Sequence, residues 1–396
     1  MTRPDAGGRR GGPAGVRLTA GGAHRCFAGH PWIYAGEIAG VRGEPAPGET
    51  VWVRDGRGGF VGSGLYNPGS EIRIRLFSRE RENFDLGLIE RRLRQAEARR
   101  AGAEVCRLLW SEADGLPGFV VDKYGSVAVM QSMTAAADAH GPEFLQAVQH
   151  VVGPTAIIER SDAPGRAYEG LAPKIGVAMG EYKGPTRHRV GDALFELDLF
   201  GGQKTGAYLD QVGNYRAVAP FAKGKRVLDC FSHTGGFAIH CALAGAISVE
   251  AIEANDVAVA NGRRNAELNG ASIKWHQQNA FDWLRLAERE RRKFGLIILD
   301  PPSFTRSRSR VEDALRGYRE IHVRALSMVD SGGVLATFCC SHHVDAATFE
   351  DVVREAAADA HRSATLIERR SQGPDHPVLL SMPETEYLKG LILAVA

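Results

Sequence analysis

The chain has 396 residues, more than twice the ~150 residues of a typical domain, which is enough for two or three packed domains. Its hydrophobic content of 44% and charged content of 24% exclude a wholly disordered or collagen-like chain. The formal net charge is +2, from 49 Lys and Arg against 47 Asp and Glu, so a polyanionic partner would have to meet a local basic patch.

The sequence carries no signal for a membrane span, an export leader or a metal site. No run approaches the ~18 apolar residues of a membrane span, and the first residues lack an apolar leader segment, so we expect a cytoplasmic protein. The six cysteines form no Cys-x-x-Cys pair and no Cys/His ligand spacing, which predicts reduced thiols without disulfides or zinc.

The N-terminal region divides into a tail and a small β unit. Residues 1–15 contain five glycines, two prolines and three arginines with little apolar content, which predicts a disordered basic tail. Over residues 16–80, short apolar or alternating runs separated by Pro and Gly predict a small all-β unit. Residues 1–80 hold eleven Arg and no Lys against seven Asp and Glu, an excess of four that suits an RNA-facing module.

Residues 81–185 mix helical and strand patterns. Leu86, Ile89 and Leu93 have helical spacing opposite an arginine-rich face, which indicates a solvated connecting helix over residues 84–100. Residues 118–130 predict a hairpin that turns at Tyr124-Gly125, followed by a helix over 142–152 and a strand over 155–158. These elements predict a small α+β middle domain.

From about Val190 onward, apolar strands alternate with helices, a pattern typical of a parallel sheet covered on both faces. The expected strands are residues 226–229, 248–253, 294–300 and 333–339, and the expected helices are residues 237–244, 256–269 and 314–328. We therefore expect a doubly wound, Rossmann-like α/β domain over residues 186–396.

In such sheets, ligands bind beyond the carboxyl ends of the strands. The first expected strand is followed by residues 229–237 (Asp-Cys-Phe-Ser-His-Thr-Gly-Gly-Phe), a glycine-bearing turn that opens a helix and lets the backbone approach a ligand. The turn is neither G-x-G-x-x-G nor a P-loop, so ordinary strand-to-helix packing is the alternative. Glu253 ends the second strand, where its carboxylate can accept hydrogen bonds from both hydroxyls of a ribose, or can instead cap a helix.

A third motif, Asp300-Pro301-Pro302-Ser303-Phe304, follows the apolar run over residues 296–299. Two prolines at a strand end stiffen a loop that has given up backbone donors, and a purely structural turn rarely needs that sequence. Together the three strand ends resemble those of the class I S-adenosylmethionine-dependent methyltransferases.

The resemblance implies which residues bind the cofactor. They are Asp229, Phe231, Ser232, Gly235 and Phe237 in the first turn, Glu253 at the ribose, Asn279 with Ala280 at the adenine, and Asp300. Asn279 replaces the usual Asp. Its amide oxygen can still accept a hydrogen bond from the adenine amino group, but without charge assistance, so weaker binding is expected.

Further motifs extend the resemblance over nearly the whole chain. They are residues 30–32 (His-Pro-Trp), 114–118 (Asp-Gly-Leu-Pro-Gly), 159–162 (Glu-Arg-Ser-Asp), 202–211 (Gly-Gln-Lys-Thr-Gly-Ala-Tyr-Leu-Asp-Gln), 214–216 (Asn-Tyr-Arg), 375–377 (Asp-His-Pro) and 386–389 (Glu-Tyr-Leu-Lys). This set resembles the bacterial 23S rRNA cytosine-5 methyltransferases. The resemblance implies a PUA domain over residues 16–80, a middle domain of strand-strand-helix-strand-strand order, 23S rRNA as partner, and Lys204, Thr205 and Gly206 near the cofactor. It leaves a homodimer open.

Cys340 follows the apolar run over residues 334–338 and matches the family's Cys-Ser pair with Ser341. Carbon 5 of cytosine is a poor nucleophile, and a thiolate that adds at carbon 6 makes carbon 5 reactive, which is covalent catalysis. Cys340 is therefore the expected nucleophile, with Cys339 on the opposite face of the strand. Without the family context, a cysteine at a strand end is usually a small buried hydrophobe.

Asp300 is expected to bind the extruded cytosine at its ring nitrogen or amino group. A base must then remove the carbon 5 proton, and the sequence does not identify it. His342 and His343 are near in sequence but are more simply surface histidines. Because Ser303 stands where a second cysteine would be needed, a two-cysteine release mechanism is unsupported.

Residues 305–310 (Thr-Arg-Ser-Arg-Ser-Arg) directly follow the Asp-Pro-Pro motif and could bind phosphates around the target nucleotide, or could simply be solvated.

Two other functions stay open from the sequence. An exocyclic amino methyltransferase acting on guanine or adenine in RNA also uses Asp-Pro-Pro followed by an aromatic residue, and Cys340 distinguishes the two reactions. A noncatalytic RNA-binding assembly factor could use the same fold as a scaffold, although the intact set of Asp229, Glu253 and Asp300 argues against it.

Overall fold

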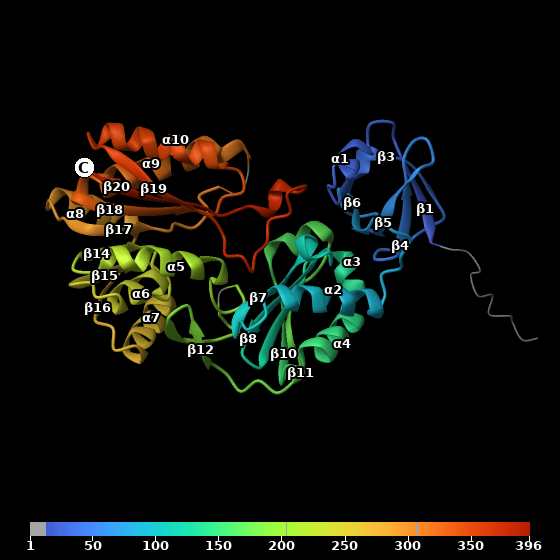
Figure 1. Ribbon diagram of the computed structural model, residues 1–396, viewed down its shortest axis with the longest axis horizontal. Helices are drawn as coiled ribbons and strands as arrows, with labels where there is room; N and C mark the ends of the chain where they lie inside the picture. Colours follow the sequence, from blue (N-terminus) through green and yellow to red (C-terminus); the bar gives the residue numbers. More distant parts are fainter. Residues whose placement is uncertain (1–12, 203, 306–307) are drawn as a thin grey trace, which may run out of the picture. The chain divides into compact units, whose positions relative to one another are not determined.

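The computed structural model describes residues 13–202, 204–305 and 308–396 (Figure 1). Its contacts divide the chain into two compact units, Met1–Tyr182 with Val378–Pro383, and Lys183–Pro377 with Glu384–Ala396. Of the predicted disordered tail, residues 1–12 lie outside the described residues, whereas Ala14 and Gly15 already belong to strand β1 (Ala14–Leu18). Residues 378–383 pack with the first unit because Met382 is buried and Ser381 lies against Gly29, although the sequence placed this segment in the catalytic domain.

The N-terminal part of the first unit is a six-stranded sheet in the order β2-β6-β5-β4-β1-β3. Its other elements are α1 (His24–Phe27), β2 (Trp32–Tyr34), β3 (Ile38–Arg42), β4 (Thr50–Arg54), β5 (Phe60–Tyr66) and β6 (Ile72–Ser78). Alternate residues face the core: Val16 and Leu18 of β1 and Val51 and Val53 of β4 are buried. The all-β prediction for this region is confirmed.

The rest of the first unit is a five-stranded sheet in the order β11-β10-β9-β8-β7, covered by helices. The elements are α2 (Leu86–Arg99), β7 (Val105–Trp110), β8 (Phe119–Tyr124), β9 (Val127–Ser132), α3 (Ala135–Ala139), α4 (Gly141–Val152), β10 (Ala156–Ser161) and β11 (Lys174–Gly180). Leu93 of α2 and Phe144 of α4 are buried against Phe119 of β8, so the helix predicted as a solvated connector has a buried face.

The middle region has one strand more than the order that the resemblance implies, because the three strands β7, β8 and β9 precede α3 and α4. Strand β7 is at the edge of the sheet. It pairs antiparallel with β8, and the guanidinium of Arg107 meets the carboxylate of Asp122 across the pair at 2.8 Å. A buried ion pair of this kind leaves no polar group unpaired and helps fix the register of the two strands.

A buried polar cluster links the two sheets of the first unit. The carboxylate of Glu112 in the middle sheet region accepts hydrogen bonds at 2.7 Å from Arg75 of β6 and at 2.7 Å from the indole of Trp32. Burial would raise the pKa of Glu112, but the charge of Arg75 and the hydrogen bonds from Ser111 and Trp32 hold it below its usual value. The two sheets therefore pack as one unit.

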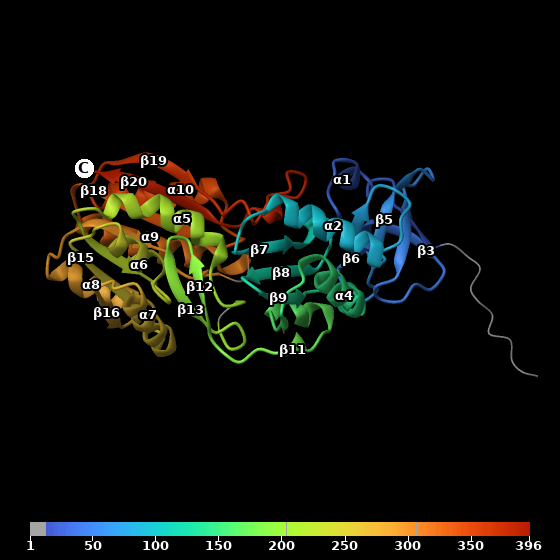
Figure 2. The same ribbon diagram turned by 60° about the horizontal axis from the view of Figure 1, so that its bottom comes forward.

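The second unit is built on a seven-stranded sheet in the order β16-β15-β14-β17-β18-β20-β19 (Figures 1 and 2). Its strands are β14 (Arg226–Cys230), β15 (Ser248–Glu253), β16 (Ile273–Gln277), β17 (Phe294–Leu299), β18 (Val329–Cys339), β19 (Ala364–Arg370) and β20 (Lys389–Val395). A hairpin of β12 (Thr186–Val190) and β13 (Ala193–Leu197) precedes it. The four predicted strands are all present and adjacent in the sheet.

Helices cover both faces of this sheet. One layer is α8 (Ala280–Arg289), α9 (Val311–Met328) and α10 (Ala346–Asp359), and the other is α5 (Val212–Val218), α6 (Gly236–Leu243) and α7 (Asp256–Leu268). The doubly wound prediction is confirmed. The four predicted strands pair in parallel as expected, and the sheet also contains β20, which runs antiparallel to both β18 and β19.

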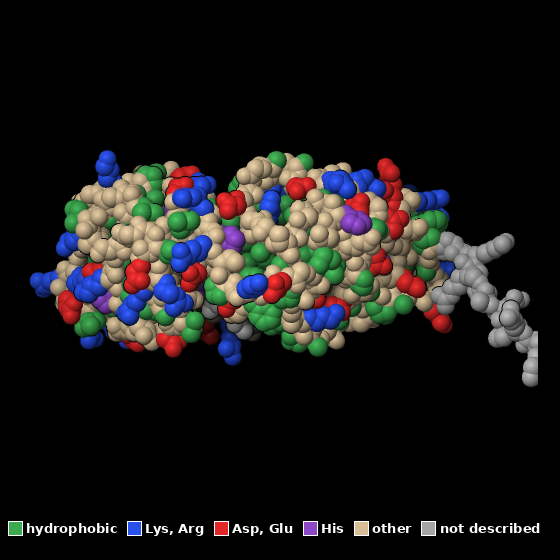
Figure 3. All heavy atoms as spheres, turned by 90° about the horizontal axis from the view of Figure 1, so that it is seen from below, with side chains coloured by type: hydrophobic (Ala, Val, Ile, Leu, Met, Phe, Trp, Pro, Cys, Tyr) green, Lys and Arg blue, Asp and Glu red, His purple; other side chains and the backbone are tan. Residues whose placement is uncertain are grey.

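Basic and acidic side chains are interspersed on the face shown in Figure 3. The near balance of charge over the whole chain, a net +2, is therefore also seen locally on this face. Among the described residues, no helix is both long enough and apolar enough to cross a membrane.

Candidate active site

A cavity of about 720 Å³ opens at the carboxyl ends of β14, β15, β17 and β18 in the second unit. Nine of the predicted site residues line it, namely Lys204, Phe231, Ser232, Phe237, Glu253, Asn279, Ala280, Asp300 and Cys340. Four others do not reach its surface: Thr205, Gly206, Asp229 and Gly235. The strand-end rule therefore brings residues separated by more than 100 positions into one site.

The turn after β14 has an unusual backbone. Phe231, His233 and Gly235 all have positive φ, at 63°, 50° and 91°, a conformation that residues other than glycine rarely adopt. Such strain persists only where neighbours hold it. Here the backbone N–H of Ser232 donates to the carbonyl of Ile252 at 3.0 Å. The turn is therefore a specific construction and not an ordinary strand-to-helix connection.

Asp229 lies beneath this turn and organises it. Its Oδ2 accepts hydrogen bonds from the hydroxyl of Ser232 at 2.6 Å and from the backbone N–H of Ala238 at 3.0 Å. Its Oδ1 is buried and has no hydrogen-bond partner among the described residues. Burial raises the pKa of Asp229 to about 7, and the charge of Glu253 adds to the effect.

Glu253 connects the ends of two strands. Its Oε2 accepts from the backbone N–H of His233 at 2.9 Å, and its Oε1 accepts from that of Asn255 at 2.9 Å. The cap of α7 is Asn255, whose side chain accepts from Ala258 N. Glu253 is therefore not the helix cap that the sequence left open, and its carboxylate faces the cavity.

Asn279 has a structural task as well as a place in the cavity. It is the N-cap of α8, and its Oδ1 accepts a hydrogen bond from the backbone N–H of Phe281 at 2.9 Å. Because an amide has one acceptor oxygen, that oxygen would serve the helix and an adenine amino group together.

Asp300 and Cys340 follow the neighbouring parallel strands β17 and β18. Burial raises the pKa of Asp300 to about 7, with contributions from the charges of Asp210 and Asp229 that outweigh the lowering by Lys204. The sulfur of Cys340 lies 4.0 Å from the carbonyl oxygen of Pro301. Burial and then the charge of Asp300 raise the pKa of Cys340 to about 11.

Cys339 is turned away from this site. Its sulfur donates to the hydroxyl of Tyr318 at 3.3 Å in the core under α9, whereas Cys340 lines the cavity. The two adjacent cysteines therefore have separate surroundings, as the alternation along a strand predicts.

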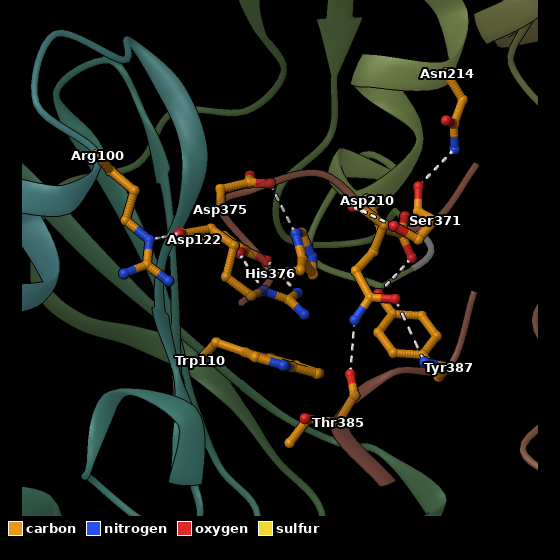
Figure 4. Close-up of polar contacts among 12 residues, drawn as sticks. Arg100, Trp110, Asp122, Asp210, Asn214, Ser371, Asp375, His376, Thr385 and Tyr387 are labelled. Atoms are coloured by element: carbon orange, nitrogen blue, oxygen red, sulfur yellow. Dashed lines mark hydrogen bonds and ion pairs between the residues drawn. The ribbon is translucent and has the colours of Figure 1, made fainter. Parts of the chain in front are cut away.

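A cluster of Lys204, Asp210 and Tyr387 was not predicted as a unit. The carboxylate of Asp210 accepts from the ammonium of Lys204 at 2.9 Å. It also accepts from the hydroxyl of Tyr387 at 2.7 Å (Figure 4). Burial would raise the pKa of Asp210, but the charges of Lys204 and His376 keep it well below its usual range. Lys204 also lies 4.1 Å from the ring centre of Tyr208. Both segments belong to the quoted motifs, but nothing in the sequence pairs one with the other.

Aromatic side chains supply much of the remaining wall. Tyr208, Tyr215, Phe281, Phe304 and Tyr387 line the cavity and were assigned no role from the sequence. Flat rings of this kind suit the planar faces of a target nucleobase and of the cofactor's adenine.

Of the two histidines considered as bases, His342 lines the cavity and His343 does not. Burial lowers the pKa of His342, as do the nearby Lys389 and His343, so its imidazole is neutral at pH 7. The predicted basic loop is only partly described: residues 306 and 307 and the side chain of Arg308 lie outside the described residues. Among the described residues, no group of three or more His, Cys, Asp or Glu could hold a metal ion.

These features fit S-adenosylmethionine. The strained turn and the carboxylate of Glu253 line the cavity with polar groups that suit a cationic amino acid and a ribose, and the buried, unpartnered Oδ1 of Asp229 lies beneath that turn. With the Asp300-Pro301-Pro302 loop beside them, the sheet and cavity define a class I S-adenosylmethionine-dependent methyltransferase.

Comparisons with known proteins agree. The family model for S-adenosylmethionine-dependent methyltransferases matches residues 186–392, and the model for PUA-like domains matches residues 16–79. The chain is 36% identical to ribosomal RNA large subunit methyltransferase I of Klebsiella pneumoniae, over 92% of this chain and 94% of that protein. It is also 36% identical to the protein of that name from Shewanella denitrificans, over 96% and 99%. The chain belongs to the ribosomal RNA large subunit methyltransferase I family.

Solved structures support the fold. A Streptococcus mutans chain assigned to the S-adenosylmethionine-dependent methyltransferases superposes with a TM-score of 0.82 at 17% identity, covering 96% of this chain and 99% of the other. SMU.776, solved in complex with SAH, gives a TM-score of 0.84 at 17% identity over the same shares. The predictions of fold class, cofactor and methyltransferase activity are confirmed.

Proposed function

We propose that the protein methylates carbon 5 of a cytosine in 23S rRNA through a covalent bond between the Cys340 sulfur and carbon 6. The observation that carries this proposal is the shared cavity of Cys340 and the Asp300 loop, with the sulfur 4.0 Å from the Pro301 carbonyl. A thiol beside a loop that can hold a base edge is the arrangement that covalent activation of a pyrimidine needs. The names of the relatives, which specify large-subunit rRNA, support the substrate class.

The residues divide the chemistry between them. The Cys340 sulfur forms a bond to carbon 6, the electrons of the 5,6 double bond move to carbon 5, and protonated Asp300 donates a hydrogen bond to ring nitrogen 3. S-adenosylmethionine supplies the methyl group that carbon 5 accepts. A base then removes the carbon 5 proton, the double bond re-forms, the carbon–sulfur bond breaks, and the cysteine leaves as a thiolate.

The protonation states of Cys340 and Asp300 set a requirement for these reaction steps. With a pKa of about 11, Cys340 is a thiol at neutral pH, whereas Asp300, with a pKa of about 7, exchanges its proton readily there. The thiol must therefore lose its proton when the target cytosine enters the cavity. Lys204 lines the cavity, and its positive charge favours that loss.

The residues that we propose to hold the cofactor either line the cavity or support the residues that line it. Ser232, Phe237, Glu253 and Asn279 line the cavity directly, with Asp229 beneath them. Lys204 lines it on the other side, while Thr205, Gly206 and Gly235 shape the backbone from behind, Gly235 and Gly206 with φ of 91° and 130°.

The decisive experiment compares Cys340→Ala with Cys339→Ala, which removes the adjacent thiol from the core. Labelled methyl transfer to 23S rRNA should fall by at least about 10³-fold in Cys340→Ala, and Cys339→Ala should retain it. Mass spectrometry of the product should show 5-methylcytidine. Retained transfer in Cys340→Ala, or methylation of an exocyclic amino group, would replace this proposal with the amino methyltransferase.

The identity of the target is part of the proposal. Mapping 5-methylcytidine in 23S rRNA with and without the gene, on free RNA and on assembling subunits, would establish the nucleotide and the substrate form. A homodimer and a cytoplasmic location stay predictions, which sedimentation and fractionation would test.

A further inference from the structure

We propose that Lys389 is a positioning residue for Cys340. Lys389 begins β20 and lies opposite Cys339 in the antiparallel pair of β18 with β20. Its ammonium donates hydrogen bonds to the backbone carbonyl of Ser341 at 2.6 Å and to that of Tyr387 at 2.9 Å. Lys389 does not line the cavity, so it acts on the site through the residues that it holds.

The two carbonyls belong to two separate segments beside the cavity. Ser341 directly follows the proposed nucleophile, and its side chain is fully buried. Tyr387 lines the cavity, and its hydroxyl donates to Asp210, which in turn binds Lys204. Lys389 therefore ties the loop of Cys340 to the backbone of Tyr387, and the side chain of Tyr387 continues the connection to the Asp210–Lys204 pair.

The charge on Lys389 makes this connection strong. Hydrogen bonds from an ammonium are about twice as strong as those between neutral groups, and partial burial reduces competition from water. Burial lowers the pKa of Lys389, whereas neighbouring Cys339, Cys340, Asp345 and Glu386 raise it. Other contacts to the Ser341 carbonyl are weaker, the backbone N–H of Val344 lying at 3.4 Å. Loss of the ammonium would therefore release the segment that places the sulfur.

This inference rests on the proposed role of Cys340 as nucleophile. Covalent catalysis requires the attacking atom at a defined distance, and a displacement of about 1 Å can cost about 100-fold in rate. The motif at residues 386–389 would thereby help to position Cys340, a role that the sequence alone does not indicate.

The test compares Lys389→Met and Lys389→Arg with Arg362→Met. Arg362 is the matched control because it also donates to backbone carbonyls of the same domain, those of Leu326, Val329 and Ala396, and it does not line the cavity. Methyl transfer to 23S rRNA, affinity for S-adenosylmethionine and thermal stability are measured for each. Alkylation of Cys340 by iodoacetamide is followed from pH 7.5 to 9.5, since the other five cysteines are buried.

Lys389→Met should lower kcat about 10- to 100-fold, leave KM for RNA and the affinity for S-adenosylmethionine within about threefold, and change the alkylation rate of Cys340 at least threefold. Lys389→Arg should recover part of both rates, and Arg362→Met should leave both unchanged. Unaltered kcat and alkylation in Lys389→Met would overturn the proposal, as would losses in Arg362→Met of the same size.

Two further outcomes are decided by the same design. If Lys389→Met does not fold, Lys389→Gln carries the test, because it removes the charge and shortens the side chain, and wild-type kcat and alkylation in it would refute the positioning role. Alkylation needs no RNA, so an altered alkylation rate with retained activity in Cys340→Ala would contradict the covalent reaction but not the contact between Lys389 and the cysteine loop.

Discussion

The hydroxyl of Tyr387 donates a 2.7 Å hydrogen bond to Oδ2 of Asp210, a residue 177 positions earlier in the chain. Asp210 precedes the first strand of the seven-stranded sheet and Tyr387 precedes the last, so this one bond joins segments from both ends of the domain beside the cavity. Because Asp210 also binds Lys204, the pair fixes the position of a buried charge that acts on Asp300 and Cys340.

Asp210→Asn should shift the pH dependence of methyl transfer. After burial, the charge of Asp210 is the next cause that raises the pKa of Asp300, and it also raises that of Cys340. Its removal lowers both pKa values, so both limbs of the kcat/KM profile should move to lower pH by up to about one unit. Tyr387→Phe retains the Asp210 charge and should leave the positions of the limbs unchanged. Identical profiles for Asp210→Asn and wild type would refute the coupling.

Asp229→Asn should make stability less sensitive to pH. The carboxyl group has a pKa of about 7 in the folded state and about 3.9 when unfolded, so the folded state binds the proton more tightly. This contribution is fully present below about pH 4 and is lost as pH rises towards 7. The stability of the variant relative to wild type should therefore increase over that range by up to about 4 kcal/mol and then level off. Thermal unfolding at pH 4 to 8 measures it, and a constant difference would contradict the assignment.

Asn279→Asp should tighten the binding of S-adenosylmethionine. The carboxylate keeps one oxygen for the N–H of Phe281 and offers a second, charged acceptor to the adenine amino group. We expect a gain of about 2- to 10-fold in affinity by calorimetry. Asn279→Ala is the comparison: it should lose about 1 kcal/mol of stability with the cap and should bind more weakly. Weaker binding by Asn279→Asp would place the adenine elsewhere.

Gly262→Ala should destabilise the domain although alanine favours helices. A Cβ at this position in α7 would lie 2.2 Å from the ring of Trp275 in β16, so the helix and strand would have to separate. We expect a loss of about 1–3 kcal/mol, measured by thermal unfolding. In Gly213→Ala on α5, the nearest group would be the Arg370 guanidinium at 3.7 Å, and stability should stay within about 1 kcal/mol of wild type. Equal effects of both changes would rule out the steric cause.

The central strands of the second unit could be predicted because they are buried on both faces. All six residues of β17 are buried, which produces a continuous apolar run. The edge strand β16 carries Lys274, His276 and Gln277 and alternates poorly, and β19 exposes Leu366 and Ile367, so neither has a clear pattern. The apolar run of β20 was not assigned to a strand, and its antiparallel direction has no periodic signal in the sequence.

The residues of the site likewise divide into those that the sequence could predict and those that it could not. Phe231, Glu253, Asp300 and Cys340 directly follow or end strands, and the topology of parallel sheets places such residues together. Asp210 and Tyr387 come from segments outside regular strands, and only the three-dimensional contact joins them. The strained turn at Phe231 and His233 was also invisible, because neither residue type favours positive φ.

Strand β20 imposes an order of assembly on the catalytic sheet. It lies between β18 and β19, although β19 comes first in the chain, so β19 joins the rest of the sheet only through β20. Pairing of β18 with β20 closes a loop of about 50 residues, and such non-local contacts form slowly. Because Tyr387 and Lys389 lie at the start of β20, the cavity should acquire its final wall only in this late step. Folding intermediates with β14 to β18 paired should therefore bind S-adenosylmethionine poorly.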